Sequence, residues 1–381
     1  MDLTLSDEQR LLRESADRFV GETCTADHRR KAAAEPHGFS PAVWKQFAEL
    51  GWLALPIAES HGGLGGGAIE IGILMEAFGR GLVSEPYLST VVIGAGLIAA
   101  CGREAQKQAL LPKVAEGALY LAFAHAERAA RFDLDKVETT ATETPNGFRL
   151  SGHKIAVLDG SAAHQLIVSA RLVNANGSSG KLCLFLVPAG TAGMTLRDYP
   201  RLGGGHACSA DLRDVQLPAD ALLGDGADAL SAIEAVTDRA MAALGSEAVG
   251  IMQTLLDTTL EYTKIRKQFG RPLSANQVIR HRLADMAMQC DEARSMALRA
   301  ALMADAEPLA RSRAASGAKA KIGTCARFVA EQSVQLHGAM GVTEELDIGL
   351  YFKRLLAFDT LFGGSAHHFR RHATLGGRIP S

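Results

Sequence analysis

The chain has little net charge and no concentration of charge of one sign. Its 40 lysine and arginine residues nearly balance its 42 aspartate and glutamate residues, which leaves a formal net charge of −2. A protein that holds the phosphates of a nucleic acid needs a basic surface, and the sequence contains no long basic run. We therefore expect no nucleic-acid partner.

Cysteine is sparse, and the six residues are scattered along the chain: Cys24, Cys101, Cys183, Cys208, Cys290 and Cys325. No two of them have the short spacing of a zinc knuckle or of a redox-active CxxC motif. We therefore expect reduced thiols, as in a cytosolic protein, and no metal centre.

The chain also lacks a long hydrophobic run. The apolar residues 91–100 are too few to span a bilayer, and Gly94 and Gly96 interrupt them. The first ten residues are polar and acidic, unlike a secretory signal peptide. We therefore expect no membrane association and a cytoplasmic location.

The 381 residues are enough for two or three domains. The spacing of the apolar residues changes twice along the chain. Residues 1–115 show helical spacing of apolar residues, beginning with a capping box at Ser6 and Gln9. Residues 116–225 contain β-rich runs separated by turn residues, and residues 226–381 are helical again. We predict an α+β multidomain protein with an N-terminal helical domain, a middle antiparallel β domain and a C-terminal helical bundle. The last region contains three predicted long helices, at residues 227–268, 278–305 and 310–336.

Glu247 is a carboxylate within a small and apolar segment, residues 239–252, of the first of these long helices. A helical wheel places it on the shoulder of an apolar stripe, next to the polar side of the helix. The stripe consists of Leu244, Ala248, Ile251 and Leu255. A carboxylate in this position is either a solvated or structural residue, or it faces a cleft and is held there for chemistry.

Residues 266–272 end the first long helix and carry several basic side chains. Basic residues at a helix C-terminus complement the helix dipole, which is the structural interpretation. The functional interpretation is an anion site, in which Arg266 binds a phosphate with both arms of its guanidinium and Phe269 covers an aromatic ring. Gln277, at the start of the next helix, would add a hydrogen bond.

A second candidate segment is residues 335–341, which contains two glycines that permit close approach of a ligand to the backbone, Gly338 and Gly341. The structural interpretation is a glycine cap after a helix, with His337 as a core histidine.

Together these segments resemble the acyl-CoA dehydrogenase family, the flavin enzymes that desaturate acyl-CoA thioesters. Each motif is weak by itself, but the set follows the order and spacing of the family over nearly the whole chain. The matching motifs are residues 5–9, 51–52, 56–65, 151–154, 215–218, 223–224, 266–270, 335–338 and 341–343. The resemblance implies a middle β domain between an N-terminal helical domain and a C-terminal four-helix bundle, in agreement with the texture of the sequence.

The resemblance also implies FAD as the cofactor, shared between subunits. Arg266, Gln268 and Phe269 match residues that hold the pyrophosphate and adenine side of an FAD bound mainly to a neighbouring subunit. The other residues that match contacts to FAD are Gln277, Gln335, Gly338, Ser365 and His367. A shared site requires a homo- or hetero-oligomer, which in this family is a dimer of dimers, and electron-transfer flavoprotein is the implied electron acceptor.

Two histidines near the C-terminus, His367 and His368, leave further interpretations open. They are a surface pair in the structural interpretation. Together with Arg370 and Arg371, they would alternatively face a phosphate of CoA.

The sequence departs from the family at the catalytic base. The usual glutamate falls at Gly363, and glycine cannot accept a proton. A branched-chain subgroup carries its glutamate on the long helix instead, at a position that matches Ala240. Glu247 lies seven residues, or about two helical turns, further along nearly the same face, so the resemblance makes it the candidate base. In the family the backbone N–H of the catalytic glutamate also polarises the substrate carbonyl, and here Gly363 would have to supply that N–H.

A second departure lies in the middle domain. Arg131 and Phe132 stand where the family has a Gly-Ser pair that contacts the flavin and its phosphate. Ala156 and Leu158 replace a flavin-covering tryptophan and a nearby threonine. The flavin pocket of this chain is therefore altered or, in a heteromer, empty.

The expected reaction is α,β-desaturation of an acyl-CoA thioester. Only 6% of the residues are aromatic, and small residues cluster around Glu247, which favours a branched or bulky acyl group. One alternative is a subunit of a heteromeric acyl-CoA dehydrogenase that completes the FAD site of its partner without full activity of its own. The other is an acyl-CoA-binding scaffold without a redox role.

Overall fold

The computed structural model describes residues 4–173, 179–343 and 346–377, and the chain folds into two compact units. One unit is helical and comprises residues 1–31, 68–83 and 241–381, and the other comprises residues 32–67 and 84–240 and contains the β-sheet. Each unit combines segments from more than one of the three predicted regions. The boundaries at residues 115 and 225 therefore stay a prediction.

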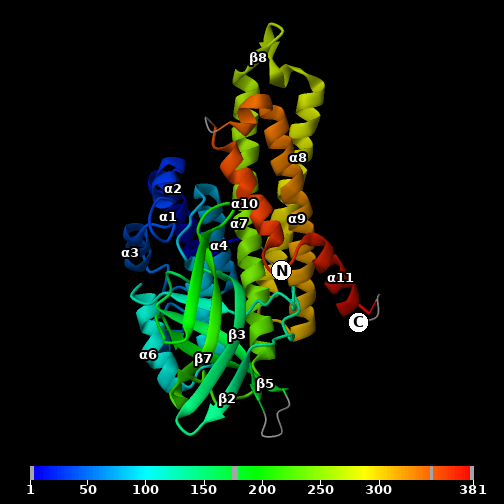
Figure 1. Cartoon of the computed structure of the whole chain (residues 1–381). Helices are drawn as coiled ribbons and strands as arrows, with labels where there is room; N and C mark the ends of the chain where they lie inside the picture. Colours follow the sequence, from blue (N-terminus) through cyan, green and yellow to red (C-terminus); the bar gives the residue numbers. More distant parts are fainter. Residues whose placement is uncertain (1–3, 174–178, 344–345, 378–381) are drawn as a thin grey trace. The chain divides into compact units, whose positions relative to one another are not determined.

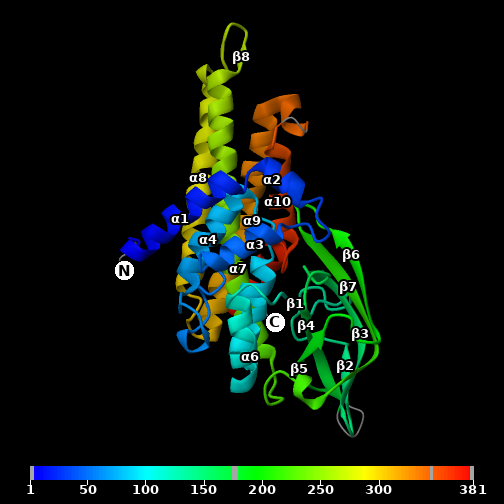
Figure 2. The ribbon, with the colours of Figure 1, turned by 90° about the vertical axis from the view of Figure 1, so that its left-hand side faces the viewer.

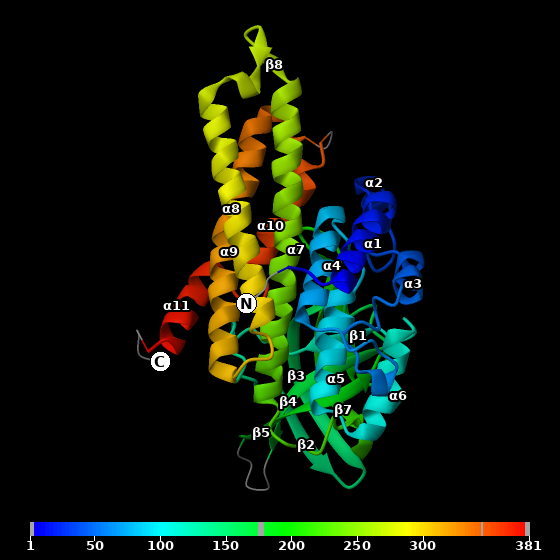
Figure 3. The same cartoon turned by 180° about the vertical axis from the view of Figure 1, so that it is seen from behind.

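The helical unit is built on long helices that lie side by side in Figures 1 and 3. They are α7 (Leu230–Ile265, from Met241 onward), α8 (Gln277–Leu302), α9 (Pro308–His337) and α10 (Ile348–Thr360). The shorter helices are α1 (Asp7–Thr23), α2 (Ala26–Ala32), α4 (Ala68–Gly81) and α11 (Ser365–Leu375), with 3₁₀ turns at Leu273–Ala275 and Gly338–Val342. The three predicted long helices are confirmed to within a few residues at each end. The capping box before α1 is also confirmed, because Ser6 and Gln9 exchange side-chain-to-backbone hydrogen bonds of 3.2 and 3.0 Å.

A short hairpin that the sequence patterns did not predict joins α7 to α8. Its strands are β8 (Lys267–Gln268) and β9 (Arg271–Pro272), and Phe269 and Gly270 form the turn. Both turn residues have a positive φ, of 52° and 78°. The hairpin forms the tip of the α7–α8 pair in Figure 1.

The sheet of the second unit has seven strands in the order β1-β4-β2-β3-β7-β6, and β5 pairs with β4. The strands are β1 (Leu121–Ala124), β2 (Thr140–Thr144), β3 (Gly147–Leu158), β4 (Gln165–Val173), β5 (Ser179–Pro188), β6 (Met194–Pro200) and β7 (His206–Leu217). The pairs β2–β3, β3–β7, β4–β5 and β6–β7 are antiparallel, as predicted. However, β4 runs parallel to both β1 and β2, so the sheet is mixed. Figure 2 shows the long, strongly twisted β3, β7 and β6.

Alternating apolar residues of the sheet form the core of the second unit. Leu150 of β3, Val168 of β4, Phe185 of β5 and Val215 of β7 are fully buried in one cluster. The helical elements of this unit are α3 (Pro41–Glu49), α5 (Gly96–Cys101), α6 (Glu104–Ala115), a π-helix at Tyr87–Ala95 and 3₁₀ turns at Glu59–His61 and Ala219–Ala221. Within the described ranges, no helix is both long and apolar enough to cross a membrane.

Glycines allow α4 and α7 to cross with their backbones in contact. A Cβ atom on Gly250 of α7 would lie 1.9 Å from the carbonyl oxygen of Glu76, and one on Gly79 of α4 would lie 2.1 Å from that of Glu247. Real Cβ atoms do not approach backbone oxygens so closely. The crossing therefore depends on both glycines, and it places α4 directly against the main chain at Glu247.

We predict that Gly250→Ala destabilises the protein by about 2 kcal/mol or more, because the two helices must separate to accept the methyl group. Gly349→Ala in α10 is the matched control, because nothing lies within 4 Å of the added Cβ. In the control, alanine should be neutral or stabilising by up to about 1 kcal/mol, owing to its higher helix propensity. Thermal and urea denaturation measure both variants, and equal stability of the two would contradict this account of the crossing.

Candidate active site

Glu247 is buried in the helical unit and forms an ion pair with Arg354 of α10. Its carboxylate Oε1 accepts the Nε–H of Arg354 at 2.7 Å and lies 2.5 Å from Nη2 of the same guanidinium. Only 4% of the residue is exposed. Glu247 is therefore more enclosed than the helical wheel predicts, because Gly79 brings α4 against its main chain and Arg354 covers its carboxylate.

The two oxygens of the Glu247 carboxylate differ in their surroundings. Within the described residues, both polar contacts to the carboxylate go to Oε1, and Oε2 has none. The guanidinium of Arg354 is anchored in addition by the carbonyl oxygen of Val83, at 3.3 Å from Nη2. One carboxylate oxygen is thus held by a charged partner.

The loop between α10 and α11 contains Gly363 and is held from α9 by Lys319. The Nζ of this buried lysine donates to the carbonyl oxygens of Phe358 and Gly363, both at 2.9 Å, and approaches that of Asp359 at 3.4 Å. It also lies 4.3 Å from the centre of the Phe358 ring. Burial lowers the pKa of Lys319 to about 8, against the raising effect of the Asp359 carboxylate.

Asp359 fixes the start of α11. Its Oδ1 accepts the backbone N–H of Ser365 at 3.1 Å and the hydroxyl of the same residue at 2.7 Å. Gly323 of α9 makes room for this arrangement, because a Cβ atom there would lie 2.2 Å from the Ser365 hydroxyl oxygen. Ser365, a predicted FAD contact, thus lies at the packed junction of α9, α10 and α11.

His367 and His368 do not form a surface pair. His368 is 1% exposed, and His367 is partly buried with its ring packed edge-on against the His368 ring at 4.9 Å between centroids. The Nε2 of His368 lies 3.0 Å from the carbonyl oxygen of Phe362. Burial lowers the pKa of His368 to about 3, and it also lowers the pKa of His367. The surface interpretation is therefore wrong, because α11 packs this face against α9.

The residues predicted to meet a neighbouring subunit's FAD lie on exposed surface. Arg266, Gln268 and Phe269 are all exposed at the α7–α8 hairpin, and Phe269 is 100% exposed. An aromatic ring in open solvent at the tip of a hairpin gains free energy when a partner covers it. Gln277, the first residue of α8, is exposed just after this hairpin.

Gln335 and Gly338 lie at the same end of the helical unit as the hairpin. Tyr262, in the last turns of α7, stacks on His337 at 4.2 Å and donates its hydroxyl to the His337 carbonyl at 3.4 Å. Gln335 and Gly338, on either side of His337, are both exposed. His337 itself is 3% exposed and bonds through Nδ1 to the Ser333 carbonyl at 2.8 Å, as expected of a core histidine.

The predicted cofactor residues thus fall into two groups on the helical unit. One group surrounds the hairpin and the end of α9. The other, Ser365 and His367, lies at the start of α11, where Ser365 packs against Gly323. Because twelve residues of α9 separate Gly323 from Gln335, the two groups are ~18 Å apart along that helix. They therefore suit two different parts of a long cofactor, or two cofactors.

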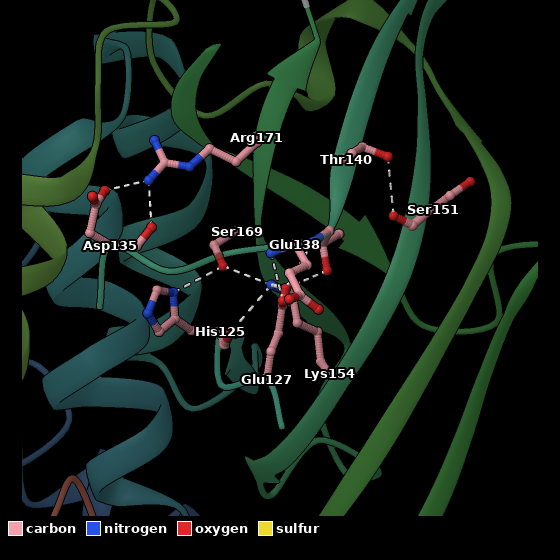
Figure 4. Close-up of polar contacts among 10 residues, drawn as sticks. His125, Glu127, Asp135, Glu138, Thr140, Ser151, Lys154, Ser169 and Arg171 are labelled. Carbon is pink, nitrogen blue, oxygen red and sulfur yellow. Dashed lines mark hydrogen bonds and ion pairs between the residues drawn. The ribbon is translucent and has the colours of Figure 1, made fainter. Parts of the chain in front are cut away.

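In the β unit, a buried lysine connects the segment that follows β1 to strands β3 and β4. Nζ of Lys154 donates to Oε1 of Glu127 at 2.7 Å, to the Ser169 hydroxyl at 3.0 Å and to the His125 carbonyl at 3.2 Å. Figure 4 shows these side chains converging, with the His125 ring on the far side of Ser169. Burial lowers the pKa of Lys154 to about 8, although Glu127 acts in the opposite direction, and burial lowers the pKa of His125 to about 3.

Glu127 closes the loop that carries Arg131 and Phe132. Its carboxylate accepts the backbone N–H of Glu138 at 2.6 Å and that of Thr139 at 3.1 Å, so it joins the two ends of the segment 127–139. Burial raises the pKa of Glu127, but the charge and hydrogen bond of Lys154, together with the hydrogen bonds from Thr139 and Glu138, give a net lowering. The carboxyl is therefore ionised at neutral pH, and the ion pair fixes the loop.

Two of the residues that depart from the family, one in this loop and one in β3, have an unusual backbone conformation. Arg131 and Ala156 have a positive φ, of 54° and 52°, a conformation that glycine adopts more readily. The backbone at Arg131 thus resembles that of a glycine, but it bears a long cationic side chain. Phe132 is 44% exposed.

Arg354 and Lys319 lie at the candidate site, but the sequence patterns gave them no role there, and they offered His368 only a surface position or a contact to a CoA phosphate. Lys319 carries a recognisable signal, because the residues three and four positions away on its helix face are small or apolar, namely Ala315, Ser316, Ile322 and Gly323. The hydrogen bonds of Arg354 and His368 depend on tertiary contacts that no sequence pattern contains.

We predict that Lys154→Met destabilises the β unit by ~3–5 kcal/mol, because it leaves the Glu127 carboxylate buried without its partner. Lys45→Met is the matched control, because Lys45 also pairs with a glutamate, Glu49, but both side chains are largely exposed. Urea denaturation followed by far-UV circular dichroism measures both variants. If Lys154→Met unfolds at the same urea concentration as Lys45→Met, the buried pair does not stabilise the loop.

Comparison with known proteins gives the same family for all parts of the chain. Models of the acyl-CoA dehydrogenase N-terminal, middle and C-terminal domains match residues 6–118, 122–215 and 230–373. The probable acyl-CoA dehydrogenase YngJ of Bacillus subtilis is 32% identical, over 91% of this chain and 92% of its own length.

Two solved structures extend the likeness to the fold. A variant of the Tcur3481–Tcur3483 steroid ACAD is 28% identical, with a TM-score of 0.87 over 98% of this chain and 99% of that one. The ChsE4–ChsE5 complex from Mycobacterium tuberculosis is 25% identical, with a TM-score of 0.88 over the full length of both chains. The chain therefore belongs to the acyl-CoA dehydrogenase family and is a flavin-dependent oxidoreductase that acts on acyl-CoA, with FAD as its cofactor.

Proposed function

We propose that this protein removes two hydrogens across Cα–Cβ of an acyl-CoA thioester, with Glu247 as the base. The observation that carries the proposal is the Glu247 carboxylate, buried and held at one oxygen by Arg354. Gly363 and Ala240, which match the positions of the base in relatives, cannot accept a proton. Glu247 has the required chemistry on the same helix as Ala240.

In the proposed reaction, Glu247, Arg354 and Gly363 of the helical unit have separate roles. Oε2 of Glu247 takes the proton from Cα, while Arg354 keeps the carboxylate oriented through Oε1. FAD, when bound, supplies the hydride acceptor for the hydrogen that leaves Cβ. A backbone N–H at Gly363 donates to the thioester carbonyl oxygen, where negative charge develops.

The residues of the helical unit fit an FAD that is shared between chains. The fully exposed Phe269 and the exposed Arg266 and Gln268 would contact the adenine and pyrophosphate side of a neighbouring chain's FAD. Gln277, Gln335 and Gly338 would contact the same cofactor, and Ser365 and His367 would touch FAD near the α10–α11 loop. The proposal therefore includes an oligomer, which by family resemblance is a dimer of dimers. Electron-transfer flavoprotein is the proposed electron acceptor, and the cytoplasm is the proposed location.

A branched or bulky acyl group is the proposed substrate class. Gly363 has no side chain, and the segment around Glu247 contains mostly small residues, including Ala240, Ala243 and Ala248. The similar Tcur3481–Tcur3483 protein is named a steroid ACAD, and a steroid is a bulky group of this kind. We also propose that residues 1–115, 116–225 and 226–381 are the three functional domains of the chain.

A second candidate function is a subunit of a heteromeric dehydrogenase that completes the FAD site of a different chain. The observation that favours it is Arg131, whose cation and positive φ stand where relatives have a glycine beside the flavin. The ChsE4–ChsE5 structure, a complex named for two components, also supports it by similarity. Glu247 opposes it, because a subunit without a reaction of its own needs no base.

We predict that Glu247→Gln slows flavin reduction by about 10³-fold or more, because the isosteric amide accepts the Arg354 hydrogen bond but not a proton. The measurement is anaerobic stopped-flow titration of the FAD-loaded protein with butyryl-CoA, isobutyryl-CoA and a CoA thioester of a steroid side chain. Glu261→Gln, an exposed residue on the same helix, is the control and should bleach like wild type. If Glu247→Gln also bleaches like wild type, Glu247 is not the base.

The ratio of bound FAD to protein chains distinguishes the two candidate functions. If this chain is a complete enzyme, the purified protein should hold one FAD per chain, measured from flavin absorbance after denaturation against protein concentration. One FAD per two chains of different sequence, after co-expression with a related subunit, would support the heteromer instead.

A further inference from the structure

The loop that carries Gly363 has an unusual backbone, and side chains from two helices hold it. Phe362 and Gly363 both have a positive φ, of 56° and 110°. For phenylalanine this conformation costs free energy, so surrounding contacts must maintain it. Glycine adds the freedom to leave it, because it has no Cβ to restrict φ and ψ.

The peptide groups on both sides of the Gly363 Cα are nevertheless held through their carbonyl oxygens. In the Phe362–Gly363 peptide, the carbonyl of Phe362 accepts a hydrogen bond from Nε2 of His368 at 3.0 Å. The carbonyl after it, that of Gly363 itself, accepts from Nζ of Lys319 at 2.9 Å. Because a peptide group is planar, with its C=O and N–H pointing in opposite directions, fixing the Phe362 carbonyl also fixes the direction of the Gly363 N–H.

That Gly363 N–H is buried and has no acceptor within the described residues. A buried backbone donor without a partner costs about 1–3 kcal/mol, so proteins rarely leave one unless a ligand completes the bond. Some other polar groups around the loop do have partners. Oδ1 of Asp359 accepts from Ser365, and the carbonyl of Phe358 accepts from Lys319.

The protonation state of His368 suits a permanent donor. A carbonyl oxygen only accepts hydrogen bonds, so Nε2 of His368 must carry a hydrogen. The ring is neutral when Nδ1 carries no hydrogen. Burial, with Lys319 nearby, holds the pKa of His368 at about 3, and Nδ1 has no partner among the described side chains. The hydrogen bond to Phe362 therefore persists across the physiological pH range.

Gly363 and His368 are also sterically matched. A Cβ atom on residue 363 would lie 2.7 Å from Cδ2 of His367 and 3.0 Å from Nε2 of His368. A glutamate at this position would force both rings to move. Loss of the side chain at residue 363 is thus linked to the histidine that holds its backbone.

We propose that His368, assisted by Lys319, is a positioning residue that orients the Gly363 N–H toward the thioester carbonyl oxygen of the substrate. The inference rests on the proposed desaturation. It extends that proposal by explaining how a flexible glycine can supply a fixed donor, which relatives obtain from the backbone of a larger residue. His368 contacts neither substrate nor cofactor in this role and acts only through the peptide group.

The test compares His368→Leu, which removes the donor, with His368→Gln, which keeps an N–H at a similar reach. His372→Leu is the matched control, because His372 lies one turn later on α11 and also bonds to a carbonyl, that of Arg313 on α9 at 2.9 Å. The FAD-loaded proteins receive the acyl-CoA that reduces the wild-type flavin fastest, with ¹³C at its thioester carbonyl. Infrared difference spectroscopy measures the carbonyl stretching frequency, and stopped-flow absorbance measures flavin reduction.

We expect His368→Leu to slow flavin reduction by about 10- to 100-fold with little change in half-saturation, since the lost interaction acts mainly in the transition state. The carbonyl band should move toward its frequency in water, because the carbonyl is less polarised. His368→Gln should recover most of both effects, and His372→Leu should match wild type. A His368→Leu protein with wild-type band and rate, or a His372→Leu protein with the same losses, would overturn the inference.

The proposed function and this inference can fail separately. If wild-type flavin is reduced by no acyl-CoA, the proposed desaturation fails, and the role of His368 fails with it. If wild type reacts normally and His368→Leu does too, only the positioning role fails. Melting temperatures of all variants show whether a loss of rate comes from unfolding.

Discussion

The Glu247–Arg354 ion pair is the interaction on which the helical unit's candidate chemistry depends. Each charge is costly to bury alone, and together they tie α10 to α7 at one point. Phe358, four residues or ~6 Å further along α10, supplies one of the carbonyl groups that Lys319 binds from α9. One short helix therefore sets the positions of both the candidate base and the candidate carbonyl donor.

The pair also orients the Glu247 carboxylate, because both of its contacts from Arg354 reach the same oxygen. The contacts from Arg354 go to Oε1 of Glu247. At Gly363, similarly, the carbonyl is bound by Lys319, and the N–H has no acceptor among the residues that the structure describes.

In the β unit, a buried ion pair fixes a loop that carries exposed residues which depart from the family pattern. Lys154 and Glu127 hold the segment 127–139 in place, and Lys154 lies within one of the matched family motifs. Arg131 and Phe132 project from that fixed segment with side chains that the family does not have there. The buried ion pair that shapes the loop is therefore separate from the exposed side chains of Arg131 and Phe132.

The sequence by itself determined the α+β class, the long helices and the family, because these follow from periodicity and from motifs in a fixed order. It also identified Glu247 as an unusual carboxylate and Gly363 as an unusual glycine. Only the tertiary structure decided their partners, the enclosure of Glu247, the burial of His368 and the parallel pairing of β4. The physical reason is that a hydrogen bond between Glu247 and Arg354, or between His368 and Phe362, depends on how helices pack and how a loop turns. Helical periodicity tells which face of a helix is apolar, but not which charged group from a distant segment will meet it.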